Sequence, residues 1–195
     1  MFRLLSRRSS ITLLLMTITA LSVWQLQKQP AKNPTITTQS QGAPDSFMEN
    51  FTLQILDTQG QLQYQLQATY MAHYADDDRS ELIKPQFIAF RPDGQRWTAV
   101  AETGLAIGGT DKIMLNGAVI IQRNNSSGAP VDLEIRTRDL NITPADDYAE
   151  TDMKTTIIHG KDSKKAISES VGLQVYFRKG QLNLLSQVKG VYAPQ

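Results

Sequence analysis

The glycine-rich segment GLAIGGTDKIMLNG, residues 104–117, has the residue types of a phosphate-binding loop. A P-loop, however, needs the spacing G-x-x-x-x-G-K-[ST] and a helix directly after it. Here Lys112 follows GGTD and is followed by Ile113, where a strand pattern begins. Gly108 and Gly109 lie within a two-residue hydrophobic period, which favours a hairpin turn. The segment therefore predicts a turn between strands and not a nucleotide site.

Acidic residues and histidines are the other candidates for chemistry. The clusters ADDDR (75–79) and PADDY (144–148) lack the spaced oxygens and central glycine of an EF-hand, and they fit solvent-exposed turns better than paired catalytic carboxylates. His73 and His159 have no second histidine nearby, and the chain contains no cysteine. No G-x-S-x-G or H-E-x-x-H motif occurs. We expect no enzyme activity, no metal site and no cofactor.

The charge of the chain is divided unevenly. Five basic residues precede residue 45, whereas from Ser46 onward 15 Lys and Arg stand against 18 Asp and Glu, a net charge of −3. A duplex-binding domain needs a concentrated basic face. We therefore do not expect nucleic acid as a partner.

The amino terminus has the pattern of a membrane anchor. The segment RLLSRRSS precedes an uncharged run, residues 11–26, which would rise about 24 Å as a helix against roughly 30 Å of hydrocarbon. The early arginines predict a cytoplasmic amino terminus. The tripeptide ALS at 20–22 leaves a cleaved signal peptide as the alternative. The residues expected in the bilayer are Ile11, Leu13, Leu14, Leu15, Ile18, Leu21, Val23 and Trp24.

Composition and periodicity then divide the chain into four parts. We expect a cytoplasmic basic segment at 1–8, a transmembrane anchor at 9–26, a polar linker at 27–45 and one exported domain at 46–195. In the domain, apolar residues alternate with polar ones, as in LQYQLQATY (62–70), and turn sequences such as RPDG and NNSSGAP separate the runs. These patterns predict an all-β barrel, sandwich or jelly roll.

Four strand–turn–strand segments within the domain form a weak repeat. They start at Ala68, Ala101, Thr137 and Ser168, with offsets of 33, 36 and 31 residues. One such hairpin cannot bury its apolar face alone, whereas stacked copies can. Gly117 lies in the middle of one strand pattern, where a missing side chain permits a bulge or a close approach to the interior.

The apolar face of these strands has two interpretations. Either it closes on itself as a core, or it forms a trough that contacts a lipid chain, and inward apolar faces look alike in both cases. The candidate inward residues are Phe51, Leu53, Ile55, Leu62, Tyr64, Leu66, Phe87, Trp97, Ile113, Leu115, Val119, Leu133, Ile135, Leu173, Val175, Phe177 and Leu184.

The domain resembles the lipopolysaccharide export protein LptC family. The resemblance is carried by FTLQILDTQGQLQYQLQA, PQFIAFRPDGQRWTAVAETG, KIMLNGAVIIQR, LEIRTRDLNITP, YAETD and LNLLSQVKGVY, in that order, over most of residues 46–192. A basic amino terminus, one anchor and a polar linker before the domain agree with it. Lys161, Lys164 and Lys165 match no role in the family.

The resemblance implies a fold, a location and partners. The fold would be a β-jelly-roll-like (LptA/OstA-like), repeat-built periplasmic domain preceded by one transmembrane helix in the inner membrane of a Gram-negative bacterium. The family binds the acyl chains of lipopolysaccharide along its interior. It receives this lipid from the inner-membrane ABC transporter of LptB, LptF and LptG, and passes it to the periplasmic bridge protein LptA by edge-to-edge stacking, here through the C-terminal strands.

Two other functions stay open from the residues alone. A structural adaptor with a solid core would tether partner proteins to the membrane without binding lipid, and it needs the same strands. A jelly-roll hydrolase would need a convergent carboxylate pair, which the pattern does not contain. Co-isolation or photolabelling with lipopolysaccharide distinguishes the transport component from the adaptor.

Overall fold

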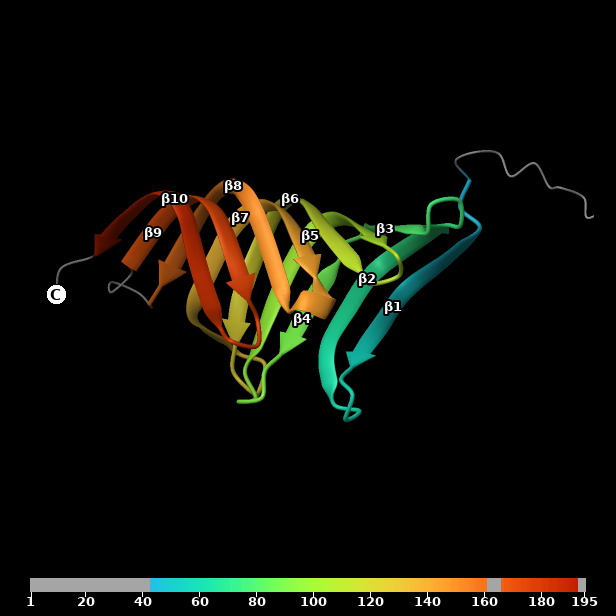
Figure 1. Ribbon diagram of the computed structural model, residues 1–195, viewed down its shortest axis with the longest axis horizontal. Helices are drawn as coiled ribbons and strands as arrows, with labels where there is room; N and C mark the ends of the chain where they lie inside the picture. The colour runs from blue at the N-terminus through green and yellow to red at the C-terminus, as the bar shows by residue number, and fades with distance from the viewer. Residues whose placement is uncertain (1–42, 161–165, 193–195) are drawn as a thin grey trace, which may run out of the picture. The chain divides into compact units, whose positions relative to one another are not determined.

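The computed structural model describes residues 43–160 and 166–192, and ten strands of this part form one antiparallel sheet (Figure 1). Alternating apolar residues produce these strands, as the sequence predicts for an all-β domain. The strands are β1 (Ser46–Leu56), β2 (Leu62–Tyr74), β3 (Arg79–Ile83), β4 (Gln86–Phe90), β5 (Arg96–Ile107), β6 (Lys112–Asn124), β7 (Pro130–Thr143), β8 (Tyr148–His159), β9 (Ala166–Tyr176) and β10 (Gln181–Tyr192), with the short 3-10 helix η1 (Pro144–Asp146) between β7 and β8.

The strands follow one another in the sheet in the order of the chain. The path runs β1-β2-β3-β5-β6-β7-β8-β9-β10, and β4 takes the same lane as β3, between β2 and β5. Pro85 separates β3 from β4 because proline has no N–H to donate to a neighbouring strand. Strands β1 and β10 are the two edges, and they lie at opposite ends of the sheet in Figure 1.

Tight turns connect the strands where the sequence predicts them. The N–H of Gly94 donates to the carbonyl of Arg91 in the RPDG turn, and Gly108 and Gly109 form the tip between β5 and β6. Both tip glycines have positive φ, which favours glycine. The prediction of a hairpin turn in the glycine-rich segment is therefore confirmed.

A line of bulges crosses the sheet and bends its strands, and we call this line the crease. At the crease the backbone φ is positive in six strand or strand-break residues, and the pairing register shifts beside most of them. An extra residue in one strand bends that strand and increases its twist. The six residues are Asn50, Lys84, Gly117, Asp139, Gly172 and Gln187.

Gly117 is the clearest of these bulges. Its φ is 78°, its N–H donates to the carboxylate of Asp139 at 2.7 Å, and the registers of both neighbouring pairings shift beside it. A Cβ built on Gly117 would have no atom within 4 Å. Of the two predicted roles, the bulge is confirmed, whereas the close approach is wrong because the space beside Gly117 is open.

The crease lets two halves of the same sheet face each other across an apolar core. Side chains from the strand portions before and after the crease contribute to one cluster, so Leu66 and Ala99 from one half share it with Leu140 and Val175 from the other. Two of the four repeat starts, Ala101 and Thr137, lie next to register breaks at the crease. The weak repeat therefore coincides with the crease in β5 and β7.

Several expectations lie outside the described residues. They concern the cytoplasmic segment at 1–8, the anchor at 9–26, most of the linker at 27–45 and the three lysines Lys161, Lys164 and Lys165. Among the residues that the structure describes, no helix has the length and apolar character needed to cross a membrane.

Candidate functional site

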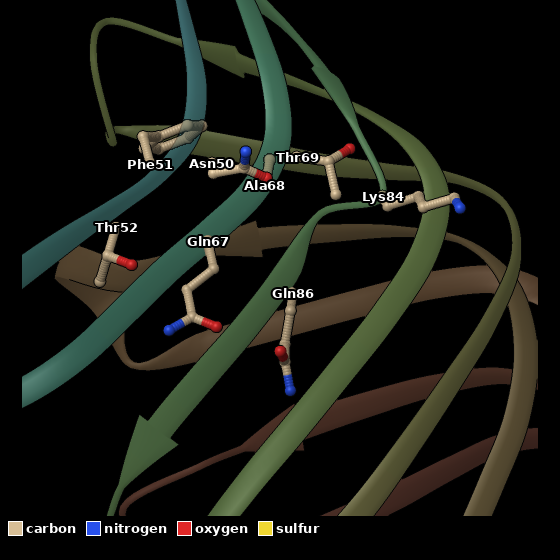
Figure 2. A pocket seen from close by; sticks show the side chains of 8 residues that line it. All are labelled: Asn50, Phe51, Thr52, Gln67, Ala68, Thr69, Lys84 and Gln86. Carbon is tan, nitrogen blue, oxygen red and sulfur yellow. The ribbon is translucent and has the colours of Figure 1, made fainter.

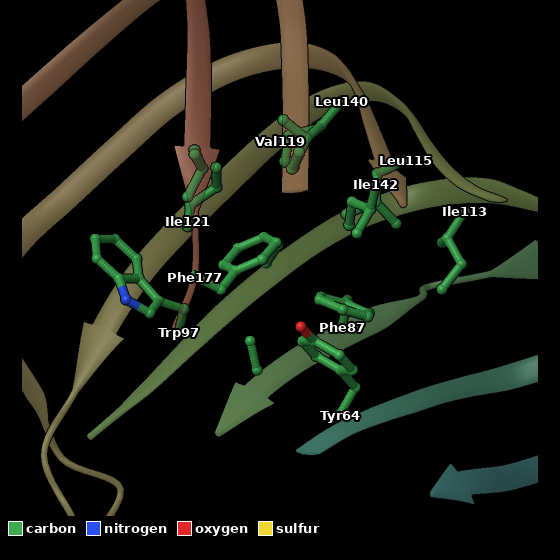
Figure 3. Packing of buried hydrophobic residues seen from close by; sticks show 14 of the residues in the cluster. Tyr64, Phe87, Trp97, Ile113, Leu115, Val119, Ile121, Leu140, Ile142 and Phe177 are labelled. Carbon is green, nitrogen blue, oxygen red and sulfur yellow. The ribbon is translucent and has the colours of Figure 1, made fainter. Parts of the chain in front are cut away.

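The apolar interior between the two halves of the sheet is the candidate site. Figure 3 shows Phe87, Phe177 and Tyr64 grouped at its centre with Trp97 and Ile121 beside them. Twelve of the seventeen candidate inward residues are buried in this cluster, and their contact with lipid stays a prediction. They are Tyr64, Leu66, Phe87, Trp97, Ile113, Leu115, Val119, Leu133, Ile135, Leu173, Val175 and Phe177.

The remaining five candidates lie at the margins of the interior. Phe51, Ile55 and Leu184 are half-buried and pack against the cluster, and Leu62 is also half-buried. Leu53 pairs with buried Leu66 but is 40% exposed. These residues belong to β1 and β10 or to the start of β2, and edge strands have a neighbour on one side only. Full burial of all seventeen is therefore not observed.

Other interior residues were absent from the candidate set. Ile121, Leu140, Ile142 and Leu82 are fully buried in the same cluster. Ile121 continues the unbroken alternation of Ile113, Leu115 and Val119 along β6, so the simple two-residue period already places it inward. The regular alternation within β7 places Leu133 and Ile135 inward, but the bulge at Asp139 restarts it at Leu140. A change of phase in the alternation at Asp139 is the signal that would have found Leu140 and Ile142.

Aromatic rings join the amino-terminal strands to the carboxy-terminal ones. The rings of Tyr64 and Phe87 stack with centroids 5.5 Å apart, and Phe87 contacts Phe177 at 5.6 Å. Tyr64 and Phe87 come from β2 and β4, whereas Phe177 directly follows β9. We call the place where these segments meet the seam, because it closes the interior between strands far apart in the sequence.

A partly buried hydrogen bond reinforces the seam. The hydroxyl of Tyr64 donates to Oδ1 of Asp147 at 2.6 Å, and the backbone N–H of Arg178 donates to both carboxylate oxygens at 3.1 and 3.0 Å. Asp147 has φ 55° and follows η1, which aims its carboxylate at both partners. The expectation that PADDY forms only a solvent-exposed turn is wrong at Asp147, which is half-buried.

Burial and this carboxylate set the acidity of Tyr64. Removal of Tyr64 from water disfavours the phenolate, and the hydrogen bond and negative charge of Asp147 add to that effect, so the pKa of Tyr64 is raised well above its ordinary value. Partial desolvation, with Glu150 as acceptor 2.7 Å from the hydroxyl, raises the pKa of Tyr148 to about 12. Tyr64 therefore acts as a neutral hydrogen-bond donor across the physiological pH range.

The two edge strands present apolar side chains to solvent. On β1 these are Phe47, Met48, Leu53 and Leu56, and on β10 they are Leu185, Val188 and Val191. An edge strand also carries backbone N–H and C=O groups without a neighbour on its outer side. Both ends of the sheet are thus suited to pairing with a further strand.

Shallow pockets lie along the crease. Figure 2 shows one of about 280 Å³, lined by Asn50, Phe51, Thr52, Gln67, Ala68, Thr69, Lys84 and Gln86. Lys84 points away from the other labelled side chains in this view. A second pocket, of about 340 Å³, lies on the other side of Lys84 and is lined partly by Val100 and Ile120. These pockets open to solvent and are separate from the buried interior.

The candidate residues for chemistry do not come together into a catalytic or metal site in the described part of the chain. Nδ1 of His73 lies 3.1 Å from the hydroxyl of Ser80, and its Nε2 lies 4.0 Å from Asp78. His159 pairs with Leu133 and Ala166 in the sheet. No group of three His, Cys, Asp or Glu side chains within these residues could hold a metal ion.

The fold and the interior define an all-β domain in which a creased antiparallel sheet encloses an apolar core. Residues 12–193 match the protein family described as "Lipopolysaccharide-assembly, LptC-related". This match covers nearly the whole chain, and the chain belongs to the LptC family, which functions in lipopolysaccharide transport in the Gram-negative envelope and is not a known enzyme family. No curated protein matches the chain.

Proposed function

We propose that this chain receives lipopolysaccharide from an inner-membrane ABC transporter, holds its acyl chains in the apolar interior and passes it to the bridge protein LptA. The observation that carries the proposal is the continuous apolar interior, which extends from β2 to β9 and is lined almost wholly by hydrocarbon and aromatic side chains. Acyl chains in such an interior are kept from water throughout their passage. The LptC family membership supports the same role.

The location follows from this role and from the amino-terminal pattern. A single helix over residues 9–26 would anchor the chain in the inner membrane with a cytoplasmic amino terminus and a periplasmic β domain. The linker at 27–45 would hold the domain away from the bilayer surface. Protease protection of the full-length chain in spheroplasts tests this topology, and a domain that resists external protease would contradict it.

The two edges of the sheet would serve different partners. Strand β1 would pair with the periplasmic part of the LptB, LptF and LptG transporter, and β10 would pair with LptA. Photoreactive residues at Phe47 and at Val191 test this arrangement because both side chains are exposed on edge strands. Crosslinks from Phe47 to the transporter and from Val191 to LptA are expected, and exchanged partners would contradict the assignment.

A structural adaptor is the second candidate, and the closed interior favours it. Phe87, Leu115, Ile135 and Val175 are fully buried against other side chains, and the seam is closed at Tyr64. An adaptor would use this core for stability alone and tether its partners through β1 and β10. In the transport role, the seam must part so that acyl chains can replace contacts between the two halves of the sheet.

Lipid labelling separates the two functions. A photoreactive residue at Leu66, which points into the interior, should label lipopolysaccharide in cells, whereas the same residue at exposed Ile120 should not. Labelling at neither position, in a folded protein that still binds LptA, would support the adaptor. The comparison uses the full-length chain, so that the natural membrane location is kept.

A further inference from the structure

Unpartnered polar atoms are concentrated at one place in the sheet. Within the residues that the structure describes, six buried side-chain nitrogen or oxygen atoms have no hydrogen-bond partner, and all six lie at the neighbouring ends of β4, β5 and β6. They are Arg91 Nε, Gln95 Oε1, Arg96 Nε, Trp97 Nε1, Arg123 Nε and Asn124 Oδ1. Buried polar groups in folded proteins are nearly always satisfied by protein or ordered water, so this concentration marks a place where water or a ligand would bind.

Four of these residues lie on the inward face. Trp97 is buried in the apolar cluster and pairs with Ala89 on β4 and Arg123 on β6. Because side chains alternate along a strand, Arg91 and Gln95 share the face of Ala89 and Trp97. Arg96 and Asn124 point to the other face, where Arg96 binds the carbonyl of Ser126 and Asn124 donates to Thr98. We call the inward set, Arg91, Gln95, Trp97 and Arg123, the β4–β6 end.

The chemistry of the β4–β6 end suits an oxyanion. Two guanidinium Nε–H groups and an indole N–H supply three donors in neighbouring positions, and guanidinium groups match the geometry of phosphate oxygens. Two acidic residues are close to Arg91: Asp93 forms an ion pair with it at 3.1 Å, and Asp57 lines the same pocket. Arg123 makes no ion pair with any described residue, so the set retains a positive charge.

The β4–β6 end also lies where a polar headgroup would emerge from the interior. Trp97, 1% exposed, belongs to the apolar cluster, and Arg91 beside it lines a pocket of about 250 Å³ together with Arg178 and the β1–β2 turn. Gly180 lets the guanidinium of Arg91 lie against the β9–β10 turn, because a Cβ there would come within 2.6 Å of the Arg91 guanidinium. Hydrocarbon and anion sites thus adjoin each other.

We propose that the β4–β6 end binds a phosphate group on the headgroup of the lipid whose acyl chains occupy the interior. This inference rests on the proposed function, because it assumes that a lipid enters between the two halves of the sheet. The phosphate accepts from Arg91, Trp97 and Arg123, which then have the partners that the protein alone does not give their donors. The site thereby distinguishes a phosphorylated amphiphile from a neutral one with the same chains.

The test compares two lipids on the full-length chain in detergent. The probes are bisphosphorylated lipid A and the same lipid A with both phosphates removed. The wild-type chain should bind the phosphorylated lipid at least tenfold more tightly, a ratio typical of one charge-assisted hydrogen bond or more. The double variant Arg91→Gln and Arg123→Gln should bind both lipids equally, with the affinity for the dephosphorylated lipid unchanged.

Three controls accompany this test: an arginine variant away from the β4–β6 end, a single variant, and inorganic phosphate as competitor. Arg79→Gln removes an arginine that is paired with Asp77 and Glu81 on the β2–β3 side, and it should keep the tenfold preference. If the double variant does not fold, Arg123→Gln alone should reduce the preference by roughly tenfold. Inorganic phosphate, at matched ionic strength, should compete only weakly with phosphorylated lipid A for the wild-type chain. If inorganic phosphate binds as tightly as phosphorylated lipid A, the site binds the free anion, and the proposal is overturned.

Two failures can be told apart. Equal binding of the two lipids by the wild-type chain, or an unchanged preference in the double variant, would overturn this inference while leaving the proposed function intact. If the wild-type chain binds neither lipid, the proposed function is contradicted, and so is the phosphate site that rests on it.

Discussion

Tyr64 and Asp147, 83 residues apart in the chain, share a 2.6 Å hydrogen bond that joins β2 to the turn after η1. Asp147 is held at the same time by the backbone N–H of Arg178, so the bond links the amino-terminal strands to two carboxy-terminal turns. The hydroxyl of Tyr64 is the one polar group that this side chain brings into the apolar cluster. The seam therefore combines the Tyr64–Asp147 hydrogen bond with the ring contacts among Tyr64, Phe87 and Phe177.

Removal of the Tyr64–Asp147 hydrogen bond should speed lipid uptake. Tyr64→Phe keeps the ring against Phe87 but removes a hydrogen bond to a carboxylate, which typically contributes about 1.5–3 kcal/mol. If the seam parts during uptake, the rate of lipopolysaccharide labelling at an interior photoreactive residue should rise severalfold.

Tyr148→Phe is the matched control for this experiment. Its hydroxyl donates to Glu150, two residues away on the same strand, and takes no part in the Tyr64–Asp147 hydrogen bond of the seam. The labelling rate of Tyr148→Phe should equal that of the wild-type chain. Equal rates in all three proteins would show that uptake does not require the seam to part at Tyr64.

Alkaline pH should destabilise the domain through Tyr64. Because its pKa is raised in the folded state, the unfolded chain loses this proton near pH 10 while the folded chain keeps it. The stabilisation is therefore complete below pH 10 and declines above it, by about 1.4 kcal/mol per pH unit for one retained proton. Tyr148, with a folded pKa of about 12, adds a loss between pH 10 and 12.

Denaturant unfolding between pH 9 and pH 11.5 measures this effect. The free energy of unfolding should fall less steeply with pH in Tyr64→Phe than in the wild-type chain, and least steeply when Tyr148→Phe is added. The same slope in the wild-type chain and Tyr64→Phe would mean that Tyr64 ionises normally in the folded state.

The crease should depend on left-handed backbone at Gly117. Gly117→Ala has room for its Cβ but forces a non-glycine residue to φ 78°, and we expect a loss of about 1–2 kcal/mol in the free energy of unfolding. Gly117→Asn should lose less, because asparagine tolerates this conformation better than alanine. Chemical denaturation measures both, and equal losses would mean that something other than φ determines the cost.

A charge in the interior should reduce lipid occupancy. Leu133 is 9% exposed near one end of the interior, so Leu133→Glu can fold while placing a carboxylate among apolar groups. Ile120→Glu, on the exposed face, is the control. The amount of lipopolysaccharide that co-isolates with the full-length chain should fall in Leu133→Glu only, and unchanged occupancy in a folded Leu133→Glu protein would argue against acyl chains at this position.

Local features of the fold were predictable from the sequence because they depend on neighbouring residues. The alternation of Leu62, Tyr64 and Leu66 with glutamines gives the inward face of β2, and Gly108-Gly109 gives the turn between β5 and β6. The burial of twelve candidate residues follows from the same alternation. These signals need no knowledge of which strands meet across the interior.

Features that depend on distant contacts were not predictable. Asp147 has the composition of an ordinary acidic turn, and only the fold brings Tyr64 and Arg178 to it. Lys84 and Gln187 adopt positive φ although neither is a residue type that favours it, so at these two positions the sheet imposes the conformation. The other crease residues, Asn50, Gly117, Asp139 and Gly172, are of types that tolerate positive φ. The β4–β6 end depends likewise on the register of Trp97 with Arg123.

Lipid photolabelling from inside the sheet tests most directly whether the interior carries lipid. A photoreactive residue replaces Leu66, which is buried, or Ile120, which is exposed on the other face, in the full-length chain in its own membrane. A lipopolysaccharide adduct is expected at Leu66 and none at Ile120. An adduct at Ile120 alone, or none at Leu66 in a folded chain that still binds its partners, would contradict the claim that the interior carries the lipid.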